Sequence, residues 1–214
     1  ALQIGTAGMD WKKITEILVA GERSAEVQRT TRETDIYVKL ELDRPGYCEV
    51  STGLGFFDHM LDALSRFAQF DLTLTCTGDL HVDEHHTIED TALALGECLS
   101  KALGDKRGIT RYGSFLLPMD EALIQTAVDI SGRSYLGYGL EIPTEKIGTF
   151  DTELVEEFWL AFVRQCPMSL HIRQLAGKNS HHIVEGCFKS VARSLKIAVK
   201  SDGTDEIPST KGVL

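Results

Sequence analysis

Two copies of a short motif, HHxxE, hold the residues of this chain that are best suited to chemistry. Their six members are His85, His86, Glu89, His181, His182 and Glu185. On a helix, residues four apart share a face, so the first histidine of each copy lies over its glutamate while the second points elsewhere. Imidazole nitrogen and carboxylate oxygen, without a thiolate, suit manganese, iron or zinc. One histidine pair alone is typical of a polar helix start, but two copies 96 positions apart favour a metal site.

Two further side chains come within reach through neighbouring elements. His59 lies in GFFDHML (55–61), a helical segment before the first motif that could bring its imidazole to the same site. At an offset of 98, the second half has Glu157 in the equivalent place. A carboxylate also binds these metals, so we expect both residues near the site. His81 and His171 lie on or beside strands and are expected to pack locally.

The motifs belong to a longer duplication that predicts the fold. Each motif starts an amphipathic helix, over 83–103 and 179–199, with Asp83 and Asn179 placed as N-caps. Each half contains three strands, a helix, a strand and this second helix. The expected strands cover 24–31, 34–42, 47–52, 72–76, 114–119, 122–131, 134–142 and 170–172, and the earlier helices cover 56–67 and 154–162. The pattern predicts an α+β protein that is internally duplicated, each half having a roughly four-stranded sheet packed against two helices.

The duplication also predicts how the chain is divided. We expect the first βββαβα repeat over 23–113, the second over 114–205 and a short tail over 206–214. Residues 1–22 lie outside the duplication as an N-terminal extension, which is either a short amphipathic helix around Trp11 or unordered. No long linker separates the halves, so we expect them to share an interface.

The composition is that of a folded protein whose partners are neither membranes nor nucleic acids. The 214 residues are 43% hydrophobic and 25% charged, and the net charge of −10 repels phosphate backbones. There is no run of about 18 apolar residues and no secretory signal, which predicts a cytoplasmic protein, or one of the plastid stroma after removal of a transit peptide. The five scattered cysteines are expected to be free thiols.

Eight blocks in order across residues 23–214 extend the pattern beyond the two histidine motifs. They are RTTRETDI (29–36), GFFDHML (55–61), DEHHTIEDT (83–91), LGDKRGITRYG (103–113), LPMDEAL (117–123), DISGRSYL (129–136), NSHHIVEGCFK (179–189) and IPSTKGVL (207–214). Together these blocks resemble the imidazoleglycerol-phosphate dehydratase family of histidine biosynthesis. The resemblance implies a ribosomal protein S5 domain 2-like fold and a homo-oligomer, a 24-mer, with active sites at subunit interfaces.

The resemblance further implies two Mn²⁺ ions per active site, held by side chains from both halves. The implied ligands are His59, His85, His86, Glu89, His181, His182 and Glu185. Some family members have a histidine at the position of Glu157. In this chain we expect Glu157 to be a carboxylate ligand, to alter the shell or to leave one position vacant.

The reaction implied is that of a carbon–oxygen lyase, a hydro-lyase. It removes water from D-erythro-imidazole-glycerol phosphate to give imidazole-acetol phosphate. The proton to be removed is bonded to carbon and is weakly acidic, and a metal-bound imidazolate would favour loss of the hydroxyl through a conjugated intermediate. Glu33 resembles a family residue close to the substrate hydroxyl and is the first acid/base candidate. Glu89 and Glu185 are ligands that could also move protons.

The resemblance also implies a phosphate site on this acidic chain. Its residues are Arg111, Arg133, Lys189, Ser209 and Lys211. Arginine can bind phosphate oxygens with two N–H groups at once, while lysine and serine add a charge and a hydroxyl donor. Lys189 follows Glu185 by four residues and so shares the metal-bearing face of its helix. The tail over 206–214 is expected to fold over the substrate as a cap.

Two other functions fit the same residues. The metals could instead generate hydroxide for hydrolysis, as in two-metal hydrolases, although the phosphate-site residues leave no obvious role for an attacking water. Alternatively, histidines from different subunits could join an oligomer that binds substrate without turnover. Analysis of the reaction product distinguishes both from dehydration.

Overall fold

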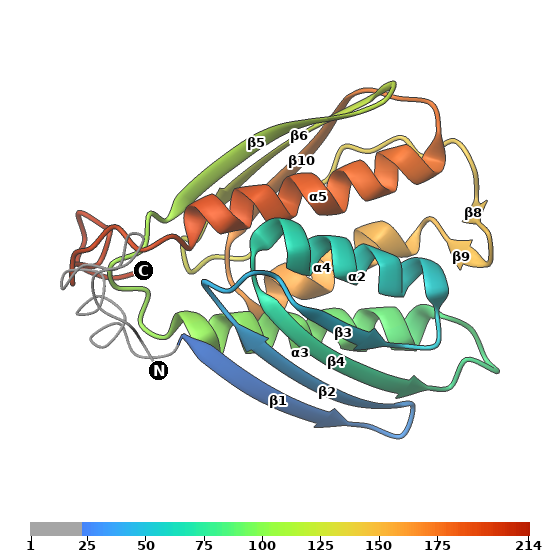
Figure 1. Cartoon of the computed structure of the whole chain (residues 1–214), viewed down its shortest axis with the longest axis horizontal. Coiled ribbons are helices and arrows are strands. Elements are labelled where there is room, and N and C mark those ends of the chain that lie inside the picture. Colours follow the sequence, from blue (N-terminus) through green and yellow to red (C-terminus); the bar gives the residue numbers. More distant parts are fainter. Residues whose placement is uncertain (1–22) are drawn as a thin grey trace, which may run out of the picture.

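The computed structural model describes residues 23–214, and its elements follow the order expected from the duplication (Figure 1). The first half comprises β1 (Ser24–Thr30), β2 (Thr34–Glu41), β3 (Cys48–Ser51), α2 (Gly55–Ala68), β4 (Asp71–Gly78) and α3 (His85–Leu103). The second half comprises β5 (Tyr112–Met119), β6 (Ala122–Asp129), β7 (Tyr135–Gly137), β8 (Lys146–Ile147), β9 (Phe150–Asp151), α4 (Leu154–Gln165), β10 (Ser169–Ala176) and α5 (Ser180–Ala198). The expected N-terminal extension over 1–22, either a short helix around Trp11 or unordered, lies outside the described residues.

Each half builds one mixed four-stranded sheet, and the two sheets have equivalent strand orders. These orders are β1-β2-β4-β3 and β5-β6-β10-β7. The first three strands of each sheet are antiparallel to their neighbours, whereas the edge strands β3 and β7 run parallel to β4 and β10. Alternate residues of β2 and β6 are buried, which is the pattern of a sheet covered on one face. The predicted α+β fold with two similar halves is therefore confirmed.

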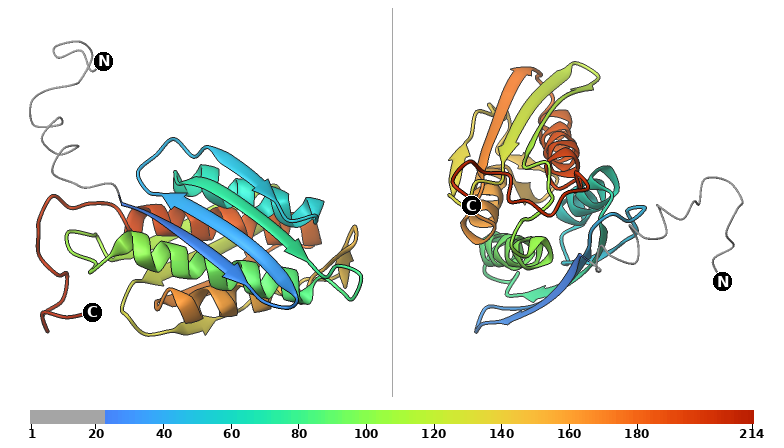
Figure 2. Two further views of the ribbon diagram at one scale, coloured as in Figure 1. Left: turned by 90° about the horizontal axis from the view of Figure 1, so that it is seen from below. Right: turned by 90° about the vertical axis from the view of Figure 1, so that its left-hand side faces the viewer.

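The four helices of residues 23–214 lie between the two sheets and pair across the halves. Figure 2, in its end-on view, shows one sheet on each side of the helices. Helix α2 packs against α5 of the other half, and α3 packs against α4. All four helices begin at the same end of the molecule, beside the β8–β9 hairpin (Figure 1). This arrangement brings helix starts from both halves together, and the histidine motifs occupy two of those starts.

Aromatic side chains fill the space where the helices of the two halves meet. Phe158 of α4 lies with its ring centroid 4.8 Å from Trp159 and 5.1 Å from Phe188 of α5, and it meets Phe57 of α2 at 5.5 Å. All four side chains are at most 1% exposed. Burying aromatic side chains is strongly favourable, so these contacts join the halves into one core.

The predicted strand over 134–142 is wrong beyond Gly137, where β7 ends after three residues. The segment continues beside β10, since Gln174 donates its backbone N–H to Gly139 at 3.0 Å. However, the Glu141 amide is bound at 2.9 Å by the side chain of Gln174 instead of a backbone carbonyl. Two glycines, 137 and 139, and Pro143 follow one another here, and such residues favour the end of a strand.

The β8–β9 hairpin was not predicted, because each of its strands has only two residues. It accounts for a change in the offset of the duplication. The β1–β2 and β5–β6 hairpins correspond at an offset of 88 (112 − 24), whereas β4 and β10 correspond at 98 (172 − 74 for paired core positions). The hairpin and its flanking loop supply the ten additional residues.

The remaining expectations about chain chemistry concern cysteines and membranes. All five cysteines are free thiols, four of them buried, as the sequence predicted. Among the helices of residues 23–214, none has the length and apolar character needed to cross a membrane.

Candidate metal and catalytic site

Three potential metal ligands converge from the two halves at the start of α5. His59 on α2 places its Nε2 atom 3.5 Å from Glu185, and His181 places its Nε2 3.0 Å from the same carboxylate. Among the described residues, these three form a group whose potential ligand atoms lie within 4.8 Å of one another. The predicted i, i+4 contact of the second motif is thus present. His59 joins the motif of the other half, because α2 packs against α5.

Glu185 is ready to act as an ionised ligand. Its side chain is 8% exposed, and this burial alone would raise its pKa. The Lys189 ammonium at 2.6 Å, together with His59 and His181, outweighs burial and lowers the pKa. A buried carboxylate that stays ionised can bind a cation, so two imidazoles and this carboxylate form a donor set that fits a divalent metal.

The first half forms a looser version of this group at the start of α3. The Nε2 atom of His85 lies 3.7 Å from Glu89, as the predicted i, i+4 spacing requires. Arg164 of α4 approaches the other oxygen of Glu89 at 3.5 Å. Glu157 lies in the first turn of α4, the helix that packs against α3. Helix α4, which carries Glu157, therefore packs against the helix of the first motif, just as α2, which carries His59, packs against the helix of the second.

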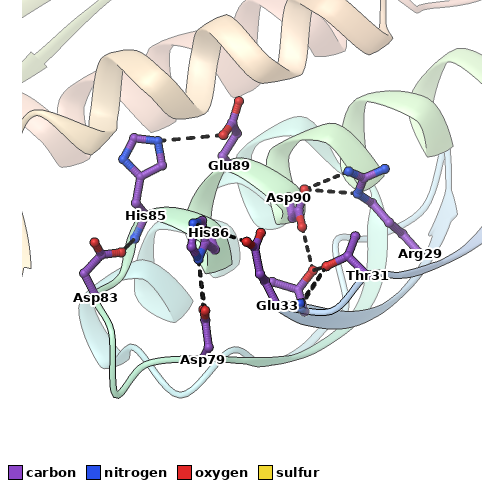
Figure 3. A network of polar contacts seen from close by, with 10 residues as sticks. Arg29, Thr31, Glu33, Asp79, Asp83, His85, His86, Glu89 and Asp90 are labelled. Atoms are coloured by element: carbon purple, nitrogen blue, oxygen red, sulfur yellow. Dashed lines mark hydrogen bonds and ion pairs between the residues drawn. The ribbon is translucent and has the colours of Figure 1, made fainter.

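The second histidine of each motif is held by a carboxylate that lies outside the motif. His86 donates from Nδ1 to Asp79 at 3.0 Å, and its Nε2 faces Glu33 at 3.8 Å (Figure 3). His182 donates from Nδ1 to Glu121 at 2.7 Å. These hydrogen bonds raise the pKa of both histidines and lower the pKa of Glu121 to about 2. The Nε2 atom of His182 faces Asp120 at 3.8 Å, as that of His86 faces Glu33.

Asp79 and Glu121 were not among the residues predicted from the sequence. Both lie in turns, where acidic residues are common for local reasons, and neither falls in the HHxxE motif. Aligning the hairpins at an offset of 88 would have placed Glu121 opposite Glu33 and shown that it deserved the same attention.

The helix starts that carry the motifs are capped differently. Asn179 is the N-cap of α5, and its side chain accepts a hydrogen bond from the His182 amide, as predicted. The prediction for Asp83 is wrong by one residue, because Glu84 occupies the N-cap of α3. Asp83 nevertheless accepts the His85 amide at 2.8 Å. The carboxylate therefore satisfies an exposed helix donor from one position further out.

The β8–β9 hairpin supports both helix starts. Phe150 of β9 lies 5.1 Å from Phe56, whose ring in turn lies 5.2 Å from that of His181. The backbone N–H of Asp151 donates to the carboxylate of Glu84 at 3.3 Å. An element too short for sequence analysis to detect therefore contacts the surroundings of both motifs.

Glu33 lies on the β1–β2 turn, and this turn is fixed to α3 by a polar network (Figure 3). Thr34 donates to the buried Asp90 at 2.6 Å, and Arg29 adds bonds of 2.8 and 3.1 Å to the same carboxylate. Thr31 accepts the Glu33 amide at 3.0 Å. The Glu33 side chain itself is 51% exposed and reaches toward His86. The network holds the backbone while leaving the carboxylate accessible.

Four of the predicted phosphate ligands lie at the end of the folded molecule opposite the histidines. The four are Arg111, Arg133, Ser209 and Lys211. The amide of Arg111 binds the carbonyl of Ala198, the last residue of α5, at 2.8 Å. Because α5 has 19 residues and rises about 1.5 Å per residue, its two ends are roughly 27 Å apart.

The C-terminal tail lies at this same distal end (Figures 1 and 2). Arg111 forms a bidentate pair with Asp129, at 2.7 and 3.2 Å, and donates to the carbonyl of Pro208 at 2.8 Å. A Cβ atom at Gly132, next to Arg133, would lie 2.7 Å from Leu214. The tail thus brings Ser209 and Lys211 to the side of the chain that carries both arginines. Lys189 does not join them, because it pairs with Glu185 near the histidines.

Comparison with known proteins establishes the family. The family model of imidazoleglycerol-phosphate dehydratase matches residues 52–195, which include both histidine motifs. The chain belongs to the imidazoleglycerol-phosphate dehydratase family. It is 57% identical over 194 residues to the imidazoleglycerol-phosphate dehydratase of Cereibacter sphaeroides, covering 90% of this chain and all of that protein. It is 56% identical to the enzyme of that name from Synechococcus, covering 90% of this chain and 96% of the relative.

Solved structures of imidazoleglycerol-phosphate dehydratases have the same fold. The enzyme from Staphylococcus aureus matches with a TM-score of 0.74 and 36% identity, covering 83% of this chain and 99% of the other. That from Pyrococcus furiosus matches with a TM-score of 0.75 and 37% identity, covering 88% of this chain and all of the other. Membership of the imidazoleglycerol-phosphate dehydratase family makes this chain a hydro-lyase of histidine biosynthesis, as the sequence blocks predicted.

Proposed function

We propose that this chain removes water from D-erythro-imidazole-glycerol phosphate to give imidazole-acetol phosphate, using two Mn²⁺ ions per active site. The observation that carries the proposal is the convergence of His59, His181 and Glu185 from separate elements of the two halves. Family membership identifies the reaction. Two imidazoles and a carboxylate are ligands that suit manganese.

The ions would be held by the histidines and glutamates at the starts of α3 and α5, with His59 contributed by α2. Glu157 on α4 would contribute a carboxylate where α2 contributes the imidazole of His59. The bound ions would make the ring N–H of the substrate imidazole more acidic, and the electron-rich ring left after loss of that proton favours expulsion of the hydroxyl group from the adjacent carbon. Chelators should therefore remove activity.

The side chains of this protein would carry out the proton transfers. Dehydration takes the hydroxyl from the carbon attached to the imidazole ring and a proton from the next carbon, and the resulting enol becomes the ketone. Glu33 is accessible and close to His86, so it is a carboxylate placed to exchange protons with substrate. Glu89 and Glu185 would serve as ligands, and the negative charge of Glu185 is also balanced by the ammonium group of Lys189.

The test of this function is production of imidazole-acetol phosphate by chelator-stripped protein with and without added Mn²⁺. We expect turnover only with the metal. Tight Mn²⁺ binding without turnover would contradict the proposed reaction and would instead support a catalytically silent assembly. Release of inorganic phosphate in place of the ketone would indicate hydrolysis.

We further propose that each active site combines the histidine end of one copy with the phosphate end of another in a homo-oligomer. Support comes from the positions of the candidate ligands, which lie at opposite ends of the roughly 27 Å helix α5 in one chain. A substrate of three carbons, a ring and a phosphate cannot span that length. The 24-subunit assembly of the family resemblance would supply the second copy.

Complementation between two variants tests this shared site. Arg133→Ala should weaken phosphate binding, and Glu33→Gln should remove the proton-transfer group, so each homo-oligomer should be poorly active at low substrate concentration. When the two chains are mixed and reassembled, roughly one quarter of sites should combine two intact ends. Activity should then recover to about that fraction of the wild-type value.

The control for complementation is the same mixture without dissociation and reassembly, which should stay as inactive as the separate variants. If reassembled mixtures gain no activity although mass spectrometry shows mixed oligomers, the site lies within one chain. That result would contradict the shared site without affecting the proposed reaction.

A further inference from the structure

The duplication places two turn carboxylates in equivalent positions with different surroundings. At the offset of 88 that relates the β1–β2 and β5–β6 hairpins, Glu33 corresponds to Glu121 (33 + 88 = 121). Each lies immediately before the second strand of its hairpin and near the second histidine of an HHxxE motif. Equivalent positions with different contacts indicate that the two residues have different roles.

Glu121 is fully engaged in hydrogen bonds at the start of α5. One of its oxygens accepts the Nδ1–H of His182 at 2.7 Å. The other accepts the backbone N–H groups of Asn179 at 2.8 Å and Lys178 at 3.4 Å. The carboxylate therefore joins the β5–β6 turn to the helix start and to the imidazole. A carboxylate with three donors around it is poorly placed to exchange a proton with substrate.

Glu33 has no such engagement, because other residues perform these tasks in the first half. The β1–β2 turn is fixed to α3 through Thr34, Arg29 and the carboxylate of Asp90. The Nδ1 atom of His86 is bound by Asp79, while Glu33 lies 3.8 Å from Nε2 of the same ring. The backbone N–H of Asp79 also donates to the carbonyl of Glu33 at 3.1 Å. Asp79 in the first half therefore takes the place that Glu121 takes in the second.

We infer that Glu121 and Asp79 are positioning residues that orient His182 and His86 for metal binding, and that Glu33 is thereby left free for proton transfer. A carboxylate that accepts the Nδ1–H fixes the imidazole in the tautomer whose Nε2 carries the lone pair. It also limits rotation of the ring. This inference rests on the proposed function, since it takes both histidines as manganese ligands.

Glutamine at position 121 separates orientation from simple loss of contact. In Glu121→Gln the amide oxygen can still accept the backbone N–H groups, so the turn keeps its anchor. The amide NH₂ group can only donate to Nδ1, which moves the ring proton to Nε2 and blocks that nitrogen as a ligand. Both carboxylate oxygens of Asp79 lie near Nδ1 of His86, at 3.0 and 3.2 Å, so an asparagine there would turn its own oxygen toward the Nδ1–H. Asp79→Ala instead removes the acceptor, which frees the His86 ring to rotate and to change tautomer.

The experiment measures the Mn²⁺ dissociation constant from the electron paramagnetic resonance signal of free Mn²⁺. We expect Glu121→Gln and Asp79→Ala to raise this constant by about 10- to 100-fold. The kcat of both variants should return toward the wild-type value at saturating Mn²⁺. Glu33→Gln is the matched control, and it should bind Mn²⁺ as the wild type does while its kcat stays about 10²- to 10⁴-fold low at every metal concentration.

Thermal unfolding of the metal-free proteins shows whether either substitution damages the fold, and Asp79→Ala tests the inference if Glu121→Gln does not fold. An unchanged dissociation constant in a folded variant would overturn the inference, as would low kcat at saturating Mn²⁺. If the wild-type protein binds no Mn²⁺, the proposed function fails instead. Wild-type binding with unchanged variants rejects the positioning role alone.

Discussion

Replacement of Glu33 by glutamine is expected to reduce kcat by about 10²- to 10⁴-fold, the usual contribution of a general acid or base. Glutamine has nearly the same shape but cannot accept and return a proton. The turn that carries it should stay in place, because its anchors are Thr31, Thr34 and Asp90 and not the Glu33 side chain. Steady-state assays at saturating Mn²⁺ and substrate measure the loss.

A glutamate elsewhere on the first half provides the control for this substitution. Glu97 lies on α3 and pairs with Lys101 at 2.7 Å on an exposed surface. Exposed pairs of this kind contribute little to stability, so Glu97→Gln should keep both stability and activity. If Glu33→Gln retains more than about a tenth of wild-type kcat, the residue does not perform general acid/base catalysis.

Replacement of His181 by alanine is expected to remove one metal ion and to reduce activity by about 10³-fold, since a catalytic ion contributes several kcal/mol. His181 is one of three converging donors, and its loss leaves His59 and Glu185 as an incomplete set. Because metal-linked stability disappears with the ion, the oligomer should also weaken. Elemental analysis measures metal content, and light scattering after size-exclusion chromatography measures assembly.

His171 offers the matched histidine for comparison. It is exposed on β10, and its ring lies 5.2 Å from that of Tyr135, away from the motifs. His171→Ala should therefore keep its full metal content. Full metal content and intact assembly in His181→Ala as well would refute the assignment of His181 as a shared ligand.

Much of the fold was predictable because the duplication repeats both apolar spacing and polar motifs. The stripe from Ile88 to Leu103 recurs from Val184 to Val199, and these positions are buried. Such periodicity identifies the buried face of a helix but not its partner. The pairing of α2 with α5 therefore emerged only in three dimensions, and with it the position of His59 beside Glu185.

The histidine and glutamate pairs of the site were predictable because helical spacing alone brings them together. His181 and Glu185 are four residues apart and meet at 3.0 Å. Asp79 and Glu121 were not, because turn geometry places them and acidic residues occur in turns for many reasons. The β8–β9 hairpin escaped for a different reason: strands of two residues are too short to show alternation.

The crossed pairing of helices also indicates how such a protein could have arisen. A half-length ancestor with one βββαβα unit could pack its α2-like helix only against another copy. The result is a twofold symmetric dimer with two identical metal-binding motifs, both at the same end. Fusion of the genes would make that association intramolecular and independent of protein concentration. Once joined in one chain, the two motifs and their surroundings could diverge in sequence. Two differences between the halves reflect this divergence. The first half has His59 where the second has Glu157, and the accessible Glu33 corresponds to the hydrogen-bonded Glu121.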